Sequence, residues 1–124
     1  MPAQITHSIF GKRAMAAAAI PVTDTAWFNL GCQGPDIFLH NQRTRPFSLS
    51  LGRLLHRSGY GTFTAWMLQK MRREQISWSS PIGSYILGFI SHAFLDRAAH
   101  PFIVYFAGWD HDYRYCHQFM DRLI

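Results

Sequence analysis

One short segment, residues 92–101, limits most strongly how this chain of 124 residues can fold. It reads His-Ala-Phe-Leu-Asp-Arg-Ala-Ala-His-Pro, so His92, Asp96 and His100 recur at every fourth position. A helix turns about 100° per residue, and each step of four therefore moves a side chain only about 40° around the axis. The three side chains are expected along one side of a single helix.

The residues around this triplet are apolar, which predicts that the helix is buried. They are Ile86, Leu87, Phe89, Ile90, Phe94 and Leu95. Two imidazoles and a carboxylate in such surroundings need polar partners, and a divalent metal ion satisfies all three. A buried hydrogen-bonded network is the alternative, but a metal explains both the spacing and the mixture of acid and base. Residue 93 is alanine, so the HExxH pattern of many zinc proteases is absent.

Length and composition indicate one globular domain. The chain is 48% hydrophobic and 15% aromatic, and its formal net charge is +5 with neutral histidines, which makes anionic ligands plausible. Two basic clusters carry that charge and form either solvated faces or a rim that attracts phosphate: Arg43, Arg45, Arg53 and Arg57, and then Lys70, Arg72 and Arg73. No basic run is interleaved with aromatic residues, as binding of single-stranded nucleic acid would require.

The cysteines and the apolar stretches point to a cytoplasmic protein. Cys32 and Cys116 are the only thiols, and we expect both to be buried and unpaired. The first residues lack a basic region followed by an apolar stretch, as a secretory signal would have. The longest apolar stretch, residues 82–95, is too short for a membrane span and contains His92.

Helical patterns account for most of the chain, and no strand-like alternation is present. We expect helices over residues 4–19, 48–57, 62–75 and 80–100, and a last one from about residue 110 or 112. Residues 31–46 are predicted to form a loop, Gly59 and Gly61 to separate two helices, and Pro101 to end or kink the long one. The predicted fold class is all-α: a single-domain bundle of about five to six helices with a metal cluster in a cleft.

Further candidate ligands are scattered along the chain, and each has an ordinary interpretation when taken alone. His117 and Asp121 form a second pair four residues apart, which would otherwise be a surface ion pair. His56 ends an amphipathic helix, Asp36 lies in a turn after a proline, and His7 lies in the first helix. We interpret the two remaining histidines, His40 and His111, as non-ligands.

Taken together, these residues resemble the zinc-dependent phospholipase C family, in particular its bacterial intracellular branch. The segments that carry the resemblance follow the family's order: Thr6-His7, Gly34-Pro35-Asp36-Ile37-Phe38, Leu51-Gly52-x-x-Leu55-His56, Gly88-Phe89-Ile90-Ser91-His92-x3-Asp96-x3-His100-Pro101, and His117-x3-Asp121. They span nearly the whole chain, and the His-x3-Asp-x3-His-Pro segment is the most specific of them.

The resemblance implies a cluster of up to three zinc ions. On that pattern, one ion is held by Asp36, His56, His92 and Asp96, a second by His100, His117 and Asp121, and a third by His7 and Asp96, with Asp96 bridging. Secreted members also use their processed N-terminal residue at the third ion, whereas this chain opens on Met1, so two ions are the expectation here.

Two other differences from the family concern the end of the chain. The family usually has glutamate where this chain has Asp121, which is one methylene shorter and places its carboxylate differently. The sequence also ends three residues after Asp121, whereas family members generally continue further. We therefore interpret residues 1–124 as a zinc-dependent phospholipase C-like domain that is shortened at its C-terminus.

The resemblance further implies a zinc-dependent phosphodiesterase that uses zinc-activated water. Asp36 is the candidate general base as well as a ligand, and Arg57 or Arg97 would attract the anionic substrate. A phospholipid headgroup is the favoured phosphodiester, which would bring the chain into peripheral contact with a membrane. The sequence does not indicate an oligomeric state.

Two other functions stay open. A nuclease of the S1/P1 type would share the metal cluster and use Trp27, Trp78 or Trp109 to stack bases, although nucleic acid is the less favoured substrate. A non-catalytic domain would use zinc only to hold its helices together.

Overall fold

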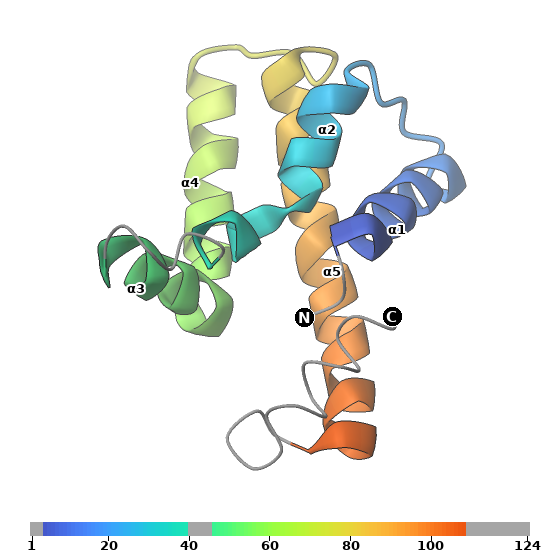
Figure 1. Ribbon diagram of the computed structural model, residues 1–124. Helices are drawn as coiled ribbons and strands as arrows, with labels where there is room; N and C mark the ends of the chain where they lie inside the picture. Colours follow the sequence, from blue (N-terminus) through green and yellow to red (C-terminus); the bar gives the residue numbers. More distant parts are fainter. Residues whose placement is uncertain (1–3, 40–45, 109–124) are drawn as a thin grey trace.

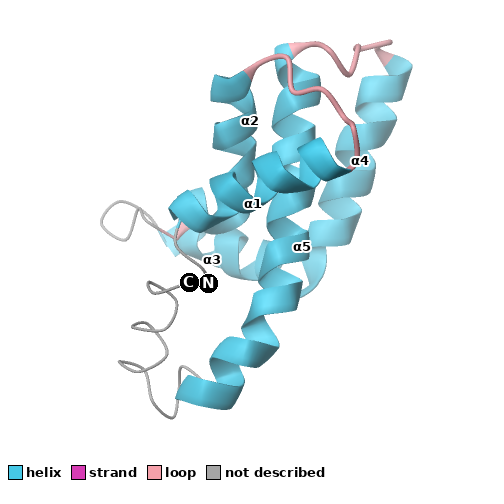
Figure 2. Cartoon of the chain, turned by 90° about the vertical axis from the view of Figure 1, so that its right-hand side faces the viewer, coloured by secondary structure: helices cyan, strands magenta, loops and turns pink. Residues whose placement is uncertain are grey.

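The computed structural model describes residues 4–39 and 46–108, and all regular structure in these two ranges is helical. The all-α prediction is therefore confirmed. The elements in chain order are α1 (Gln4–Ala17), α2 (Thr25–Cys32), the 3-10 turn η1 (Gly34–Phe38), α3 (Pro46–Leu54), the π-helical turn η2 (Leu55–Gly59), α4 (Tyr60–Arg73) and α5 (Pro81–Ala107). Helix α5 runs through the middle with α2 and α4 along its upper half (Figure 1), and α1 crosses it (Figure 2).

The start of α5 follows the sequence signal. The Ser80 hydroxyl accepts a hydrogen bond from the backbone N–H of Gly83 at 3.1 Å, and Pro81 occupies the first helical position. The helix does not end at Pro101 but continues to Ala107. Ile103 and Ala107 are buried beyond the proline, and this burial offsets the backbone hydrogen bond that proline cannot make.

Helices α2 and α5 are packed so closely that their backbones touch at glycines. A Cβ atom on Gly31 would lie 2.1 Å from the carbonyl oxygen of Tyr85, and one on Gly88 would lie 2.2 Å from that of Phe28. Phe28 and Cys32 of α2 are fully buried in this contact. The short distance between the two backbones fixes the position of the η1 turn, which directly follows α2, relative to the middle of α5.

The core on the other side of α5 is made with α4. Met67 and Met71 of α4 are buried against Ile86 and Phe89 of α5. The ring of Tyr60, at the start of α4, stacks on Phe89 with 4.5 Å between ring centroids, and its hydroxyl donates to the Phe89 carbonyl. This contact brings the junction between η2 and α4 against the centre of α5.

Two sequence predictions about chain breaks are wrong. The segment predicted as a loop contains the helical turn Gly34–Phe38, and helix α2 precedes it with Asp24 as its N-cap. The glycines at 59 and 61 do not separate two helices, because the backbone at Gly59 stays helical (φ −91°, ψ −11°) and η2 joins α3 to α4. The π-turn takes up the extra residue, so the chain bends without losing helical structure.

The remaining expectations about the chain are tested only in part. Cys32 is a buried free thiol as predicted, whereas Cys116, His40, His111 and the predicted last helix lie outside the described residues. Among the helices that are described, none is both long enough and apolar enough to cross a membrane.

Candidate metal centre

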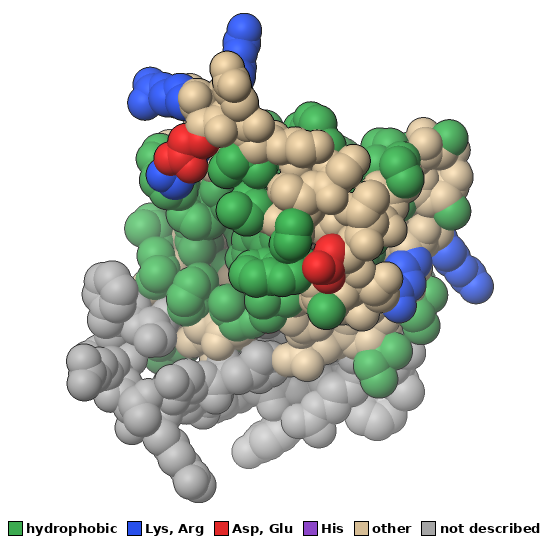
Figure 3. All heavy atoms as spheres, turned by 90° about the horizontal axis from the view of Figure 1, so that it is seen from above, with side chains coloured by type: hydrophobic (Ala, Val, Ile, Leu, Met, Phe, Trp, Pro, Cys, Tyr) green, Lys and Arg blue, Asp and Glu red, His purple; other side chains and the backbone are tan. Residues whose placement is uncertain are grey.

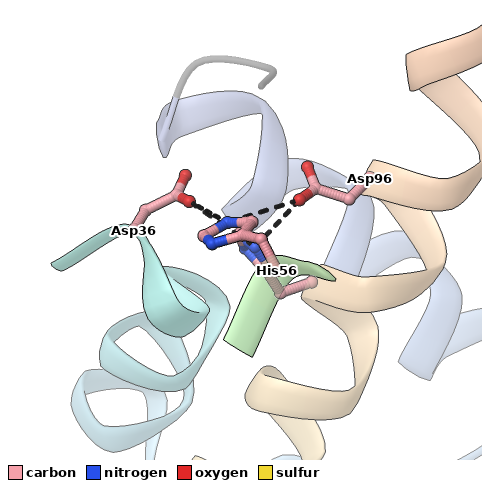
Figure 4. A group of neighbouring side chains, drawn as sticks. Asp36, His56 and Asp96 are labelled. Atoms are coloured by element: carbon pink, nitrogen blue, oxygen red, sulfur yellow. Dashed lines mark hydrogen bonds and ion pairs between the residues drawn. The ribbon is translucent and has the colours of Figure 1, made fainter. Parts of the chain in front are cut away.

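Four side chains from three segments of the chain meet at the middle of α5. Asp36 comes from η1, His56 from η2, and His92 and Asp96 from α5 itself. Each offers one ligand atom, and these four atoms all lie within 4.8 Å of one another. Figure 4 shows the His56 ring between the carboxylates of Asp36 and Asp96.

Backbone carbonyls orient both imidazoles toward the shared centre. Nδ1 of His56 lies 2.7 Å from the carbonyl oxygen of Gly52, and Nδ1 of His92 lies 3.0 Å from that of Cys32. When each Nδ1–H donates to its carbonyl, each Nε2 faces the two carboxylates. Histidines that bind metals are typically held in this way, with one ring nitrogen fixed by a hydrogen bond and the other free to ligate.

The contacts inside the centre leave polar atoms without partners. Nε2 of His56 lies 2.8 Å from Oδ1 of Asp36, but Nε2 of His92 lies 3.3 Å from Oδ2 of Asp96 and makes no hydrogen bond. Oδ1 of Asp96 is likewise buried without a hydrogen bond. Since unpaired buried polar atoms cost free energy, a divalent cation bound by these nitrogen and oxygen atoms would satisfy them. The four residues therefore fit a metal ion.

His7 adds a fifth group to the centre. Its ring stacks on that of His92 with 4.0 Å between centroids, and its Nε2 lies 3.4 Å from Oδ1 of Asp96. Both ring nitrogens of His7 are buried without a hydrogen bond. The two oxygens of Asp96 thus face different imidazoles: Oδ1 faces His7, and Oδ2 faces His56 and His92. This arrangement suits a carboxylate that bridges two ions through its two oxygens.

Local backbone features make room for the two inner histidines. Gly34 has φ +52°, and a Cβ atom there would lie 2.5 Å from the His92 ring, so only glycine allows both the conformation and the contact. His56 lies within the π-turn η2, where the extra residue changes the direction of side chains relative to an α-helix. Such turns occur frequently at functional sites.

The charges of the centre shift two pKa values in opposite directions. Burial alone would raise the pKa of Asp96, but its contacts with His7 and His92 hold that pKa well below the usual range. Burial alone would lower the pKa of His56, but its hydrogen bonds with Asp36 and Gly52 raise it above the ordinary value. Without a metal, these shifts favour the protonated form of His56 and the ionised form of Asp96.

We expect metal affinity to fall on acidification, starting above pH 6.5, the ordinary pKa of histidine. The proton on Nε2 of His56 must leave before that nitrogen can bind a metal ion, so protons and metal compete for it. Because the pKa of His56 is raised, this competition begins at a higher pH than for an ordinary histidine. Asp96 stays ionised over the same range and adds no competition. Zinc affinity measured by chelator competition between about pH 5.5 and 8.5 should change up to about tenfold per pH unit at the acidic end. A constant affinity from pH 6 to 8 would contradict this.

Of the three other predicted ligands, only His100 lies within the described residues. His100 lies one turn beyond Asp96 on α5 and lines the wall of the adjoining pocket, outside the four-residue group. His117 and Asp121 lie outside the described residues. The structure thus brings together five of the eight predicted ligands, namely His7, Asp36, His56, His92 and Asp96.

A pocket of about 680 Å³ opens beside the centre, and its size is typical of a small-ligand site. His56 and Asp96 line it together with Arg53, Arg57 and Arg97. The inner histidines are buried, and no described histidine is visible on the end of the bundle where α4 ends and α5 begins (Figure 3). His56 and Asp96 connect the centre with the pocket, because both belong to the four-residue group and both line the pocket.

Several parts of the site are not evident from the sequence. Tyr60 lines the pocket and its ring is parallel to that of His92, but it lies between two glycines that indicate a break. The carbonyls of Gly52 and Cys32 carry no side-chain signal at all. Only the spacing of four between Gly52 and His56 could have suggested their contact.

No family model, curated protein or solved structure matches this chain.

Proposed function

We propose that the protein is a metal-dependent phosphodiesterase, similar to phospholipase C, with zinc as its metal. The convergence of two imidazole nitrogens and two carboxylates within 4.8 Å carries this proposal, together with the pocket that His56 and Asp96 line. Structural zinc sites close their coordination with protein ligands, whereas catalytic sites keep one position open. A centre with two of its ligands in a pocket wall favours the catalytic kind.

Zinc bound here would act as a Lewis acid on a phosphoryl oxygen and bring the pKa of a water molecule to about 7. Hydrolysis forms a bond between the water oxygen and phosphorus, breaks the bond to the ester oxygen, and leaves a proton on the departing alcohol. Asp36 is buried and its Oδ1 is bonded to His56, so this carboxylate is positioned to hold a proton taken from the water. The imidazoles of His56 and His92 would hold the metal in a fixed position, because backbone carbonyls fix both rings.

The described residues support a nuclease less well than an enzyme similar to phospholipase C. Nucleases bind bases on aromatic platforms, and Trp27 and Trp78 are about half-exposed but do not line the pocket. Tyr60 does line it, but its ring is stacked on that of Phe89. We therefore favour a phosphodiester whose alcohol group is not read by stacking.

Metal analysis combined with a chromogenic phosphodiester assay tests the proposal. The purified chain should carry zinc and hydrolyse bis(p-nitrophenyl) phosphate, and removal of zinc by a chelator should abolish the activity reversibly. The substitution His56→Gln should reduce turnover by about 100-fold or more, since it removes a ligand and its oriented nitrogen. Leu54→Gln, at an exposed position of α3, is the neighbouring control and should leave activity unchanged. Zinc-loaded protein without phosphodiesterase activity would instead support a structural role for the metal.

A further inference from the structure

Three arginines from two parts of the fold line the pocket beside the metal centre. Arg53 lies at the end of α3, Arg57 in η2 and Arg97 on α5 directly after Asp96. Arg53 and Arg57 are four residues apart, a spacing at which like charges destabilise a helix. No carboxylate of the described residues forms an ion pair with any of the three arginines. Their charges therefore face the pocket without a described anionic partner.

The charge balance of the centre explains what these arginines can do. A divalent ion together with the ionised carboxylates of Asp36 and Asp96 and two neutral histidines would give a site with a net charge of zero. A phosphodiester carries one negative charge, and the three guanidinium groups carry three positive charges. Guanidinium groups bind phosphate and carboxylate oxygens in a forked geometry, so the pocket has capacity for more anionic groups than the scissile diester supplies.

We infer that the pocket selects phosphodiesters that carry a second anionic group, such as a terminal phosphate, on the part of the substrate outside the scissile bond. This inference rests on the proposed function, because it assigns the scissile diester to the metal centre. A cationic headgroup such as choline would meet three like charges at the same wall. Both a phosphorylated lipid headgroup and a nucleotide with a terminal phosphate contain the required chemistry.

Two matched pairs of ligands test the inference and distinguish these sources. The first pair is the dinucleotide TpT and its 5′-phosphorylated form, and the second is glycerophosphoinositol and its 4-phosphate. All four ligands are used with a phosphorothioate in place of the scissile diester, which slows hydrolysis. Calorimetry with the zinc-loaded chain then reports equilibrium binding. In at least one pair, the terminal phosphate should tighten binding by about tenfold, which corresponds to about 1.4 kcal/mol. The pair with the larger gain identifies the source of the ligand.

Single substitutions show whether the arginines cause this preference. Arg53→Gln, Arg57→Gln and Arg97→Gln should each reduce the gain from the terminal phosphate by about three- to fivefold, the size expected for a solvated ion pair. Arg73→Gln, at the opposite end of α4 from Tyr60, makes the same charge change away from the pocket and should leave the gain unchanged. Thermal melting of each variant verifies that the fold is retained.

Equal affinity within both pairs, or a preference that persists in all three pocket variants, would overturn the inference. Failure of the proposed function gives a different result, namely that the parent phosphate diesters are not hydrolysed by the zinc-loaded chain. The binding comparison does not depend on turnover, so each outcome is read independently of the other.

Discussion

Replacing Asp96 with asparagine should weaken zinc binding by at least about 100-fold and remove phosphodiesterase activity with it. The two carboxylate oxygens of Asp96 face three imidazoles, those of His7, His56 and His92. The amide of asparagine keeps one oxygen, removes the charge and places an NH₂ group against one of the rings. Chelator-competition titration and metal analysis of the purified variant measure the loss.

The control for this substitution is Glu74→Gln, which makes the same change of charge at an exposed site. Within the described residues, the ion pair of Glu74 is with Lys70, at 2.6 Å on the surface of the molecule, and such a pair contributes at most about 0.5 kcal/mol. Zinc affinity of this variant should stay within about twofold of the original chain. If Asp96→Asn retained the zinc content and affinity of the unmodified chain, the proposed centre would be wrong.

The parts of the site that the sequence predicts are those that local helix geometry determines. A spacing of four within an apolar segment is enough to place His92 and Asp96 on one side of α5, and the structure has both at the same centre. The start of α5 is also local, because the Ser80 cap and Pro81 act within one turn. Each of these predictions depends on residues less than two turns apart, where backbone periodicity decides the outcome.

The remaining parts depend on packing between distant segments, which spacing does not reveal. Asp36 and His92 are 56 positions apart and meet because Gly31 and Gly88 let α2 lie against α5. Read alone, Gly31 indicates a loop, and Gly88 indicates only a residue of low helix propensity. A break is predicted at Gly59 and Gly61 for a similar reason, although the π-turn there passes directly into α4. Glycine has a low intrinsic helix propensity, but buried Leu55 and Met67 on either side of Gly59 and Gly61 hold the helical path.

Asp36 and His56 became candidate ligands through the resemblance to a zinc enzyme family rather than through their own surroundings. The structure supplies the physical reason that was missing. The η1 turn presents Asp36 towards His56, whose Nε2 lies 2.8 Å from the carboxylate, and the Gly52 carbonyl fixes the ring. A centre of this kind is specified by backbone groups as much as by its ligands, and apart from the spacing of four between Gly52 and His56 these groups leave no trace in the sequence.

Gly88→Ala should produce a large loss of stability for a substitution that adds a single methyl group. The added Cβ would lie 2.2 Å from the Phe28 carbonyl oxygen and 2.8 Å from the Cys32 amide nitrogen, and these atoms belong to the backbone of α2 and cannot rotate away. Overpacking of this kind costs about 3 kcal/mol or more, whereas alanine returns at most about 1 kcal/mol of helix propensity. A net loss of about 2 kcal/mol should be measurable as a lower midpoint of urea unfolding.

Gly61→Ala makes the identical chemical change within α4, where a Cβ atom would meet nothing within 4 Å. Because only helix propensity acts there, this variant should be more stable by about 0.5–1 kcal/mol. The opposite signs separate the contact between α2 and α5 from any general effect of replacing glycine. Gly88→Ala should also weaken zinc binding, since moving α2 shifts the Cys32 carbonyl that holds Nδ1 of His92. Equal stabilisation by both substitutions would show that the two helices are not in backbone contact.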